Sequence, residues 1–299
     1  MQNSVDDAYQ VDSQQVRQAF NNAAKDYEEH ALLQKTVVDR LIESFDQIKI
    51  NPTVILDLGS GLGYGARQLK QQFKKAHIFQ ADISEEMLRG ARRNKSKFFS
   101  KDHFFCANAE QIALADESVD LVFSSLMLQW SNDPDLVFNE IHRVLKPNGV
   151  FVFTTFGPDT LKELRESWQQ VDNSIHVNAF TDMHDIGDAL IRNRLDAPVL
   201  SIENIVLTYD DCKQLMRDLK SIGAHNVNQG RRKTLTGKDR LQKVIQHYET
   251  FRVNHKLPAT YEVIYGHAWK PVSTKNNVTN EQQVSLESLK QDLANRKVK

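Results

Sequence analysis

The chain has 299 residues, which is enough for one large domain with additions or for two modest domains. Its composition, 40% hydrophobic and 26% charged residues, excludes collagen, coiled-coil and wholly disordered chains. No apolar run reaches the roughly 20 residues of a membrane-spanning helix, and no signal-peptide pattern opens the sequence, so we expect a cytoplasmic protein that uses no membrane. The net charge of −1 argues against general attraction to nucleic acid, and two isolated cysteines predict neither a disulfide framework nor a metal site.

Helical periodicity dominates the first part of the chain. Between about residues 13 and 45, apolar side chains recur at spacings of three and four, as in amphipathic helices. Asn51 and Pro52 then interrupt the pattern. We therefore predict an N-terminal helical cap over residues 1–48 that contains two helices.

Short apolar runs then alternate with helix-like stretches, which predicts a mostly parallel sheet covered on both faces. The runs span residues 53–58, 77–82, 103–107, 119–124 and 150–156. One helix between them has clear ends, because Asp133 can cap it, Pro134 suits its first turn and residues 146–149 stop it.

The second half of the chain continues with helix and strand signals. Thr181 is expected to cap a helix, and strand-like segments at 198–209 and 259–269 flank a helical segment that begins at Cys212 and ends at Gly223. We predict one α/β domain over residues 49–270, with a basic helical insertion at about 212–258 before its last strand. A polar tail follows over residues 271–299.

A glycine-rich loop follows the first predicted strand. Gly59, Gly61 and Gly63 lie between this strand and a predicted helix, where glycines allow a tight turn and let a ligand approach the backbone. Their spacing differs from that of the pyrophosphate loop in dinucleotide-binding proteins, which disfavours NAD. Asp82 closes the second strand, where its carboxylate can accept hydrogen bonds from ribose hydroxyls. These residues predict an adenosine-containing ligand.

Together with Asn108-Ala109-Glu110, VDLVFSSLMLQW and RVLKPNGVFVFTTFG, these motifs resemble those of class I S-adenosylmethionine-dependent methyltransferases. The resemblance implies a Rossmann-like α/β fold with a mostly parallel seven-stranded sheet, S-adenosyl-L-methionine as cofactor, S-adenosyl-L-homocysteine as product and no metal. It also implies a set of cofactor-binding residues: Asp57, Gly59, Ser60, Gly61, Gly63, Asp82, Ile83, Met87, Asn108, Ala109, Glu110 and Ser125. Ordinary helix packing is an alternative role for Ile83 and Met87. Asp57 could be a buried acid that pins the loop through backbone N–H groups, a role compatible with helping to bind the cofactor.

The acceptor is indicated by the segments around this cofactor domain. The fourth strand leads into Ser124-Ser125-Leu126 rather than an Asn-Pro-Pro-Tyr type of motif, which argues against methylation of base amines or glutamine amides. Five segments resemble the malonyl-acyl-carrier-protein O-methyltransferases of biotin synthesis: AFNNAAKDYEEHALLQKTVVDRL, SLMLQWSNDP, FTTFGPDTLKELRESW, GRRKTLTGK and LPATYEVIYGHAW. This resemblance covers roughly residues 13–271. It implies transfer of a methyl group to the free carboxylate of malonyl-acyl carrier protein, giving the methyl ester that primes pimeloyl synthesis.

A malonyl carboxylate is already ionised near neutral pH, so the implied reaction needs no general base. Catalysis would come from alignment and exclusion of water. The candidates for positioning the substrate are Tyr27, Gln129, Trp130, Arg231 and Arg232. Each has an alternative role, because the two aromatic residues could be core residues and adjacent arginines are often a solvated pair. The family often shows Arg-Arg-Gly-Leu where this chain has Arg231-Arg232-Lys233-Thr234-Leu235.

The segment from Lys213 to Lys256 is strongly basic. It contains eleven Lys or Arg and three acidic residues, a net charge of +8, which leaves −9 for the rest of the chain. We predict that this face docks the acidic carrier protein and orients its tethered thioester. A solvated face and nucleic-acid binding are the alternatives, and no nucleic-acid-binding motif accompanies the charge.

Two other functions are compatible with the sequence. The chain could methylate another small acid or a lipid precursor, or it could be a non-catalytic assembly factor that retains the cofactor fold. Binding of the cofactor without turnover in a broad panel of acceptors would favour the second alternative.

Overall fold

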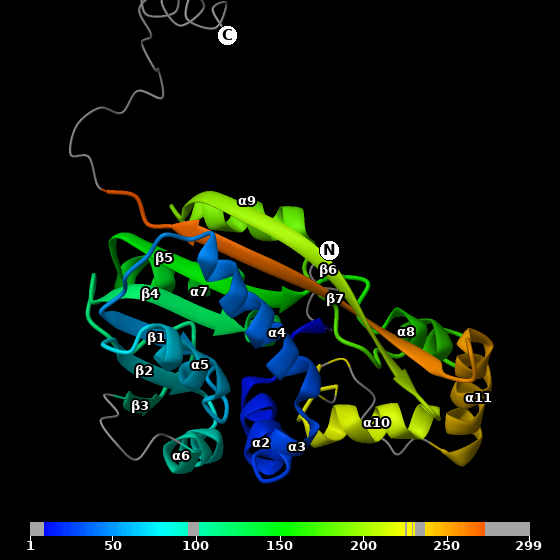
Figure 1. Cartoon of the computed structure of the whole chain (residues 1–299). Coiled ribbons are helices and arrows are strands. Elements are labelled where there is room, and N and C mark those ends of the chain that lie inside the picture. Colours follow the sequence, from blue (N-terminus) through cyan, green and yellow to red (C-terminus); the bar gives the residue numbers. More distant parts are fainter. Residues whose placement is uncertain (1–8, 95–101, 225, 229, 231–236, 273–299) are drawn as a thin grey trace, which may run out of the picture.

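The computed structural model describes residues 9–94, 102–224, 226–228, 230 and 237–272. Its strands are β1 (Val54–Leu58), β2 (His77–Asp82), β3 (Asp102–Cys106), β4 (Val119–Ser125), β5 (Leu145–Phe156), β6 (Asp196–Tyr209) and β7 (Leu257–Trp269). They form one sheet in the order β3-β2-β1-β4-β5-β7-β6 (Figure 1). Strands β1 to β5 are parallel, and β7 is antiparallel to both of its neighbours. The predicted α/β class and mostly parallel seven-stranded sheet are confirmed.

The two faces of the sheet bury different helices, because side chains alternate along each strand. On one face, Leu56 and Val122 belong to an apolar cluster with residues of α7 (Pro134–Val144) and α9 (Met183–Arg192). On the other face, Ile55 and Phe123 pack with residues of α4 (Leu32–Glu43) and α5 (Tyr64–Gln72). Helix α6 (Glu85–Asn94) lies beside β2 and β3. The carboxyl ends of the parallel strands therefore share one edge, where their loops come together.

Helix α7 begins as the sequence predicts. The side chain of Asp133 accepts a hydrogen bond from the backbone N–H of Leu136, and Pro134 occupies the first turn. The cap of α9 was predicted wrongly, since Asp182 and not Thr181 accepts the hydrogen bond from the N–H of His184, at 2.8 Å. A carboxylate directly before the first turn also complements the helix dipole.

Two further elements differ from the expectation. Strand β5 begins at Leu145 rather than near residue 150, so it includes the residues that were expected to form the turn before the strand. Its pairing with β4 has a register shift there, and the backbone of Asn148 is left-handed (φ +62°). Helix α8 (Lys162–Gln169) was not predicted, although Leu161, Leu164 and Trp168 follow the spacing of a helix face.

From Ser13 to Asp46, the described part of the N-terminal cap has three helices where two were expected: α2 (Ser13–Ala23), the single turn α3 (Tyr27–His30) and α4, followed by the 3₁₀ turn η1 (Ser44–Asp46). Between β6 and β7 the chain forms α10 (Cys212–Ser221), α11 (Lys238–Tyr248) and η3 (Glu249–Phe251), which confirms the helical insertion before the last strand. A Cβ atom on Gly223 would lie 3.2 Å from Cδ1 of Phe20, so the end of α10 approaches α2 closely. The domain boundaries at residues 48 and 270 stay predictions.

Candidate functional site

The glycine loop between β1 and α5 has a left-handed backbone at its glycines and is held by backbone hydrogen bonds. Gly59, Gly61 and Gly63 all have positive φ angles, between +54° and +77°, which glycine adopts without cost from a Cβ atom. The N–H groups of Gly59 and Ser60 both donate to the carbonyl oxygen of Ala81, at 2.8 and 3.0 Å. The loop is thereby tied to the end of β2.

Asp82 binds this loop from its position at the end of β2. Its Oδ2 accepts a hydrogen bond from the N–H of Gly61 at 2.9 Å, and its Oδ1 accepts one from the N–H of Ser84 at 2.8 Å. Burial raises the pKa of Asp82, while these backbone hydrogen bonds lower it. Each carboxylate oxygen keeps a further lone pair, which a ribose hydroxyl can use.

Asp57 is the most perturbed carboxylate of the loop region. Its side chain is 2% exposed, and it accepts a hydrogen bond from the backbone N–H of Ala66 at the start of α5. Burial raises the pKa of Asp57 to about 7, and the charge of Asp82 contributes to the rise. Asp57 Oδ2 and the hydroxyl of Ser60 are buried without a hydrogen-bond partner in the described part of the chain. Unpartnered buried polar atoms beside a glycine loop suit the amino and carboxyl groups of the methionine portion of S-adenosylmethionine.

A cavity of about 420 Å³ opens over this loop, a size typical of small-molecule sites. It brings together nearly all of the predicted cofactor residues: Asp57, Gly59, Ser60, Gly61, Asp82, Ile83, Met87, Asn108, Ala109, Glu110 and Ser125. Gly63 does not line the cavity within the described chain. Its φ of +76° favours glycine at the cap of α5, and a Cβ atom there would also lie 2.7 Å from Oε1 of Gln80 in β2.

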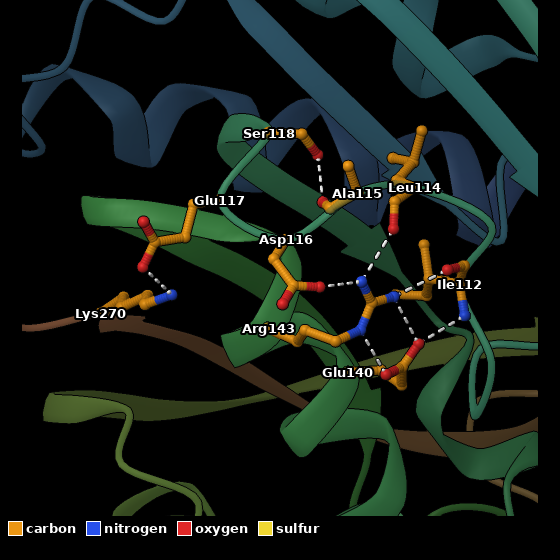
Figure 2. A network of polar contacts seen from close by, with 9 residues as sticks. All are labelled: Ile112, Leu114, Ala115, Asp116, Glu117, Ser118, Glu140, Arg143 and Lys270. Carbon is orange, nitrogen blue, oxygen red and sulfur yellow. Dashed lines mark hydrogen bonds and ion pairs between the residues drawn. The ribbon is translucent and has the colours of Figure 1, made fainter.

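The segment after β3 borders the cavity, and hydrogen bonds from Ser131 and Arg143 support it. The carboxylate of Glu110 accepts a hydrogen bond from the hydroxyl of Ser131 at 2.8 Å. Figure 2 shows how Arg143 of α7 holds the following residues, since its guanidinium donates to the carbonyl oxygens of Ile112 and Leu114, both at 2.8 Å, and to Glu140. Arg143 is therefore a support for this wall and does not line it.

The loop after β4 forms the floor of the cavity. Ser125 shares a hydrogen bond of 3.1 Å with the hydroxyl of Thr154, and Leu126 has a φ of +51°, a strained backbone for a bulky residue. The turn that follows, η2 (Leu128–Trp130), carries Gln129, whose amide Nε2 donates to the carbonyl oxygen of Leu126 at 2.6 Å. The structure thus places the predicted Gln129 at the cavity.

Aromatic residues of the N-terminal cap and of η2 line the cavity beside the glycine loop. Tyr27 packs with Leu62 and Met87, and it lines the cavity. Burial raises the pKa of the Tyr27 hydroxyl well above its usual range, and the charge of Asp82 acts in the same direction. Trp130 meets Phe20 edge to face, with ring centroids 5.2 Å apart, and also lines the cavity. Both predicted aromatic residues are packed in the protein and exposed to the ligand space.

The far wall of the cavity was not predicted from the sequence. It is largely apolar and is formed by side chains of β5, α8, the segment after it, α10 and β7: Phe156, Leu161, Leu164, Trp168, Val177, Phe180, Met216, Leu219 and Tyr261. The ring of His176 stacks on that of Trp168 with centroids 3.6 Å apart, and its Nε2 lies 2.8 Å from Oδ1 of Asp172. The helical spacing of Leu161, Leu164 and Trp168 was the signal that could have revealed this wall.

Two arginines and the polar tail of the prediction cannot be placed at the site. Arg231 and Arg232 lie outside the residues that the structure describes, as does most of the polar tail. Within residues 9–94, 102–224 and 237–272, no cluster of three or more His, Cys, Asp or Glu side chains is arranged to hold a metal ion. In the same part of the chain, none of the helices combines the length and the apolar character that crossing a membrane requires.

Comparison with known proteins places the chain among methyltransferases. A family model described as a methyltransferase domain matches residues 56–153. The malonyl-[acyl-carrier protein] O-methyltransferase of Methylovorus sp. is 48% identical over 270 residues, which cover 89% of this chain and 91% of that relative. The enzyme of the same name from Laribacter hongkongensis is 46% identical, with coverage of 89% and 92%.

Solved structures share the fold. The YcgJ protein of Bacillus subtilis matches with a TM-score of 0.57 and 15% identity, covering 79% of this chain and 99% of that chain. Haemonchus contortus phosphoethanolamine N-methyltransferase 2, solved in complex with S-adenosyl-L-methionine, matches with a TM-score of 0.53 and 17% identity, covering 84% of this chain and 57% of that chain. The predicted Rossmann-like methyltransferase fold is confirmed.

Proposed function

Because this chain belongs to the malonyl-[acyl-carrier protein] O-methyltransferase family, we propose that it transfers a methyl group from S-adenosylmethionine to the free carboxylate of malonyl-acyl carrier protein. The observation that carries the proposal is the extent of the match. Four relatives of that name are 44–48% identical over 89–91% of this chain and 91–93% of their own length. The match therefore extends well beyond residues 56–153, the part that the methyltransferase-domain model matches.

The cofactor half of the cavity supports this proposal. S-adenosylmethionine supplies, when bound, a methyl group on a sulfonium sulfur. Asp82 would accept hydrogen bonds from the ribose hydroxyls, while Asp57 and Ser60 would bind the methionine portion with their unpartnered atoms. Ile83 and Met87 would flank the adenine, and residues 108–110 would border its edge.

The acceptor half suits a substrate that needs alignment rather than activation. One oxygen of the ionised malonyl carboxylate would form the bond to the methyl carbon as the carbon–sulfur bond breaks, giving the methyl ester and S-adenosylhomocysteine. No proton moves in this step, so no general base is required. The apolar wall around Leu161 and Phe180 would exclude water. Tyr27, Gln129 and Trp130 would position the malonyl group.

A cation that orients the carboxylate must not hold it too tightly. The negative charge of the carboxylate diminishes in the transition state, so strong pairing would stabilise the reactant more than the transition state. Arg231 and Arg232 stay our candidates for this orienting role. The basic segment from Lys213 to Lys256 is our candidate for docking the carrier protein.

Mass spectrometry of carrier proteins tests the proposal. Malonyl-, succinyl- and acetyl-carrier protein are each incubated with the purified protein and S-adenosylmethionine. We expect a methyl-sized gain of mass on malonyl-carrier protein alone, because the acetyl form lacks a free carboxylate and the succinyl form is longer by a methylene group. Binding of the cofactor without any gain would contradict the proposal and favour another acceptor or a non-catalytic role.

A further inference from the structure

Helix α10 presents three cations along one side. Lys213, Arg217 and Lys220 are four and three residues apart, the spacing that places side chains on one helix face. All three are exposed, while Cys212 and Leu215 on the same helix are buried. We refer to Lys213, Arg217 and Lys220 as the α10 cation stripe.

The α10 cation stripe is not neutralised by the acids that the structure describes. Other cations of the basic segment are paired within the chain: Arg240 lies 3.6 Å from Asp172, and Arg252 lies 2.7 Å from Glu249. No described carboxylate lies within 4.0 Å of a charged nitrogen of the stripe. Two acids in or next to α10 are engaged elsewhere, since Asp218 lies 3.6 Å from His30 of α3 and Asp211 caps α10 by accepting from the N–H of Gln214. The charge of the stripe is therefore available to an anionic partner.

Lys220 connects this stripe to the cavity. It is exposed and also lines the cavity, which places it at the cavity opening, where α10 runs beside α3 (Figure 1). Two other cations of the cavity wall are already engaged, since Lys35 donates to the carbonyl oxygen of Glu28 at 2.8 Å and Arg67 to its carboxylate at 3.2 Å. The side-chain ammonium of Lys220 has no ion-pair or hydrogen-bond partner among the described residues, although its backbone carbonyl oxygen accepts from the N–H of Gly223.

We propose that Lys220 binds the phosphodiester of the carrier protein's phosphopantetheine arm at the cavity opening, and that Lys213 and Arg217 continue this contact along the carrier surface. The inference rests on the proposed function. A carrier-linked malonyl group hangs at the end of this arm, so the arm must pass the opening when the malonyl group reaches the cavity. The phosphodiester, at the protein end of the arm, then stays outside. A lysine ammonium binds such an anion as a point charge.

The decisive comparison uses two substrates that differ in the phosphate. Malonyl-carrier protein contains the phosphodiester, and malonyl-pantetheine lacks it. We expect Lys220→Glu to lower kcat/KM for malonyl-carrier protein by about tenfold, and for malonyl-pantetheine by less than about twofold. Lys220→Arg keeps the charge and is expected to retain most of the activity. Lys74→Glu, at an exposed lysine between α5 and β2, makes the same charge change far from the opening and is expected to affect neither substrate.

Each other outcome is informative. Equal losses on both substrates would show that Lys220 acts on the malonyl group or on the fold, and would overturn the inference. A loss in Lys243→Glu, on the neighbouring helix α11, that equals the loss in Lys220→Glu would assign the effect to the general field of the basic segment and would overturn the specific contact of Lys220 with the phosphodiester.

Binding measurements separate this inference from the proposed function. Fluorescence anisotropy compares carrier protein with its phosphopantetheine arm and the apo form without it. We expect wild-type protein to bind the armed form more tightly and Lys220→Glu to lose that preference. Lack of any preference in the wild type would overturn the inference even where malonyl-pantetheine is methylated, whereas absence of methylation with the preference intact would contradict only the proposed function.

Discussion

The side-chain amide of Asn132 forms two hydrogen bonds with the backbone of Val11. Its Oδ1 accepts a hydrogen bond from the N–H of Val11 at 2.6 Å, and its Nδ2 donates to the carbonyl oxygen of Val11 at 2.9 Å. Val11 also forms an isolated β-bridge with Asn228. Asn132 lines the cavity, so one side chain joins the loop after η2 to the start of the N-terminal cap.

Asn132→Ala is expected to loosen the N-terminal cap. Two hydrogen bonds to the backbone of Val11 disappear, which costs about 1–3 kcal/mol of local stability. Amide hydrogen exchange should become faster across α2, and affinity for S-adenosylmethionine should fall because residues of the cap line the proposed cofactor cavity. Gln18→Ala is the matched control, since it removes an exposed hydrogen bond to Asn22 on the same helix. Unchanged exchange in α2 would show that Asn132 does not anchor the cap.

Asp57 is expected to make stability depend on pH in an unusual direction. Its pKa is raised by burial to about 7, whereas the unfolded value is near 3.9. Between these values the folded state holds a proton that the unfolded state has released. The free energy of unfolding therefore falls as pH rises from about 4 to about 7, by at most about 1.4 kcal/mol per pH unit. Asp82, whose pKa burial also raises, contributes with the same sign.

Denaturant titrations of wild-type protein and Asp57→Asn between pH 5 and pH 8 measure this contribution. The variant is expected to gain stability relative to the wild type as pH rises, while Asp46→Asn, at an exposed acid, should follow the wild type. If the difference in the free energy of unfolding between the wild type and Asp57→Asn stays constant from pH 5 to pH 8, Asp57 is ionised throughout this range. Affinity of the wild type for S-adenosylmethionine should rise near pH 7, because ionised Asp57 attracts the ligand's ammonium group.

Gly59→Ala is expected to damage the glycine loop. The backbone φ is +77°, and a Cβ atom would lie 2.6 Å from Cγ of Met127. The left-handed backbone alone costs about 1–2 kcal/mol for a residue with a Cβ atom, and Met127 must also move. Thermal and calorimetric measurements should report lower stability and weaker cofactor binding. Gly237→Ala is the control, because φ there is −61° and a Cβ atom would meet no atom of the described residues within 4 Å.

Two substitutions of Tyr27 distinguish a packing role from contact with the substrate. Tyr27→Phe keeps the ring against Leu62 and Met87, so cofactor affinity should stay within about twofold of the wild type. Loss of the hydroxyl should lower kcat for malonyl-carrier protein if that group positions the acceptor. Tyr27→Ala removes the ring as well and should weaken binding of the cofactor. Steady-state kinetics with parallel calorimetry distinguishes these effects, and full activity of Tyr27→Phe would leave the residue a packing role only.

The sequence by itself determined the elements whose signals are local. Apolar runs predicted β1 to β4 at nearly their observed ends, and Asp133 with Pro134 marked the start of α7, because caps and strand patterns depend on neighbouring residues. The glycine loop and Asp82 were likewise recognisable, since parallel strands must bring their carboxyl ends to one edge. Most of the predicted cofactor residues accordingly line one cavity.

The tertiary structure alone decided which distant segments meet. Nothing local indicates that Asn132 holds Val11, that the end of α10 approaches Phe20, or that Lys220 reaches the cavity opening. The role of Gly63 also depends on a distant neighbour, because Gln80 occupies the space that a Cβ atom would need. Such contacts follow from how helices pack on the sheet and on one another, and this packing depends on the whole chain rather than on any one pattern.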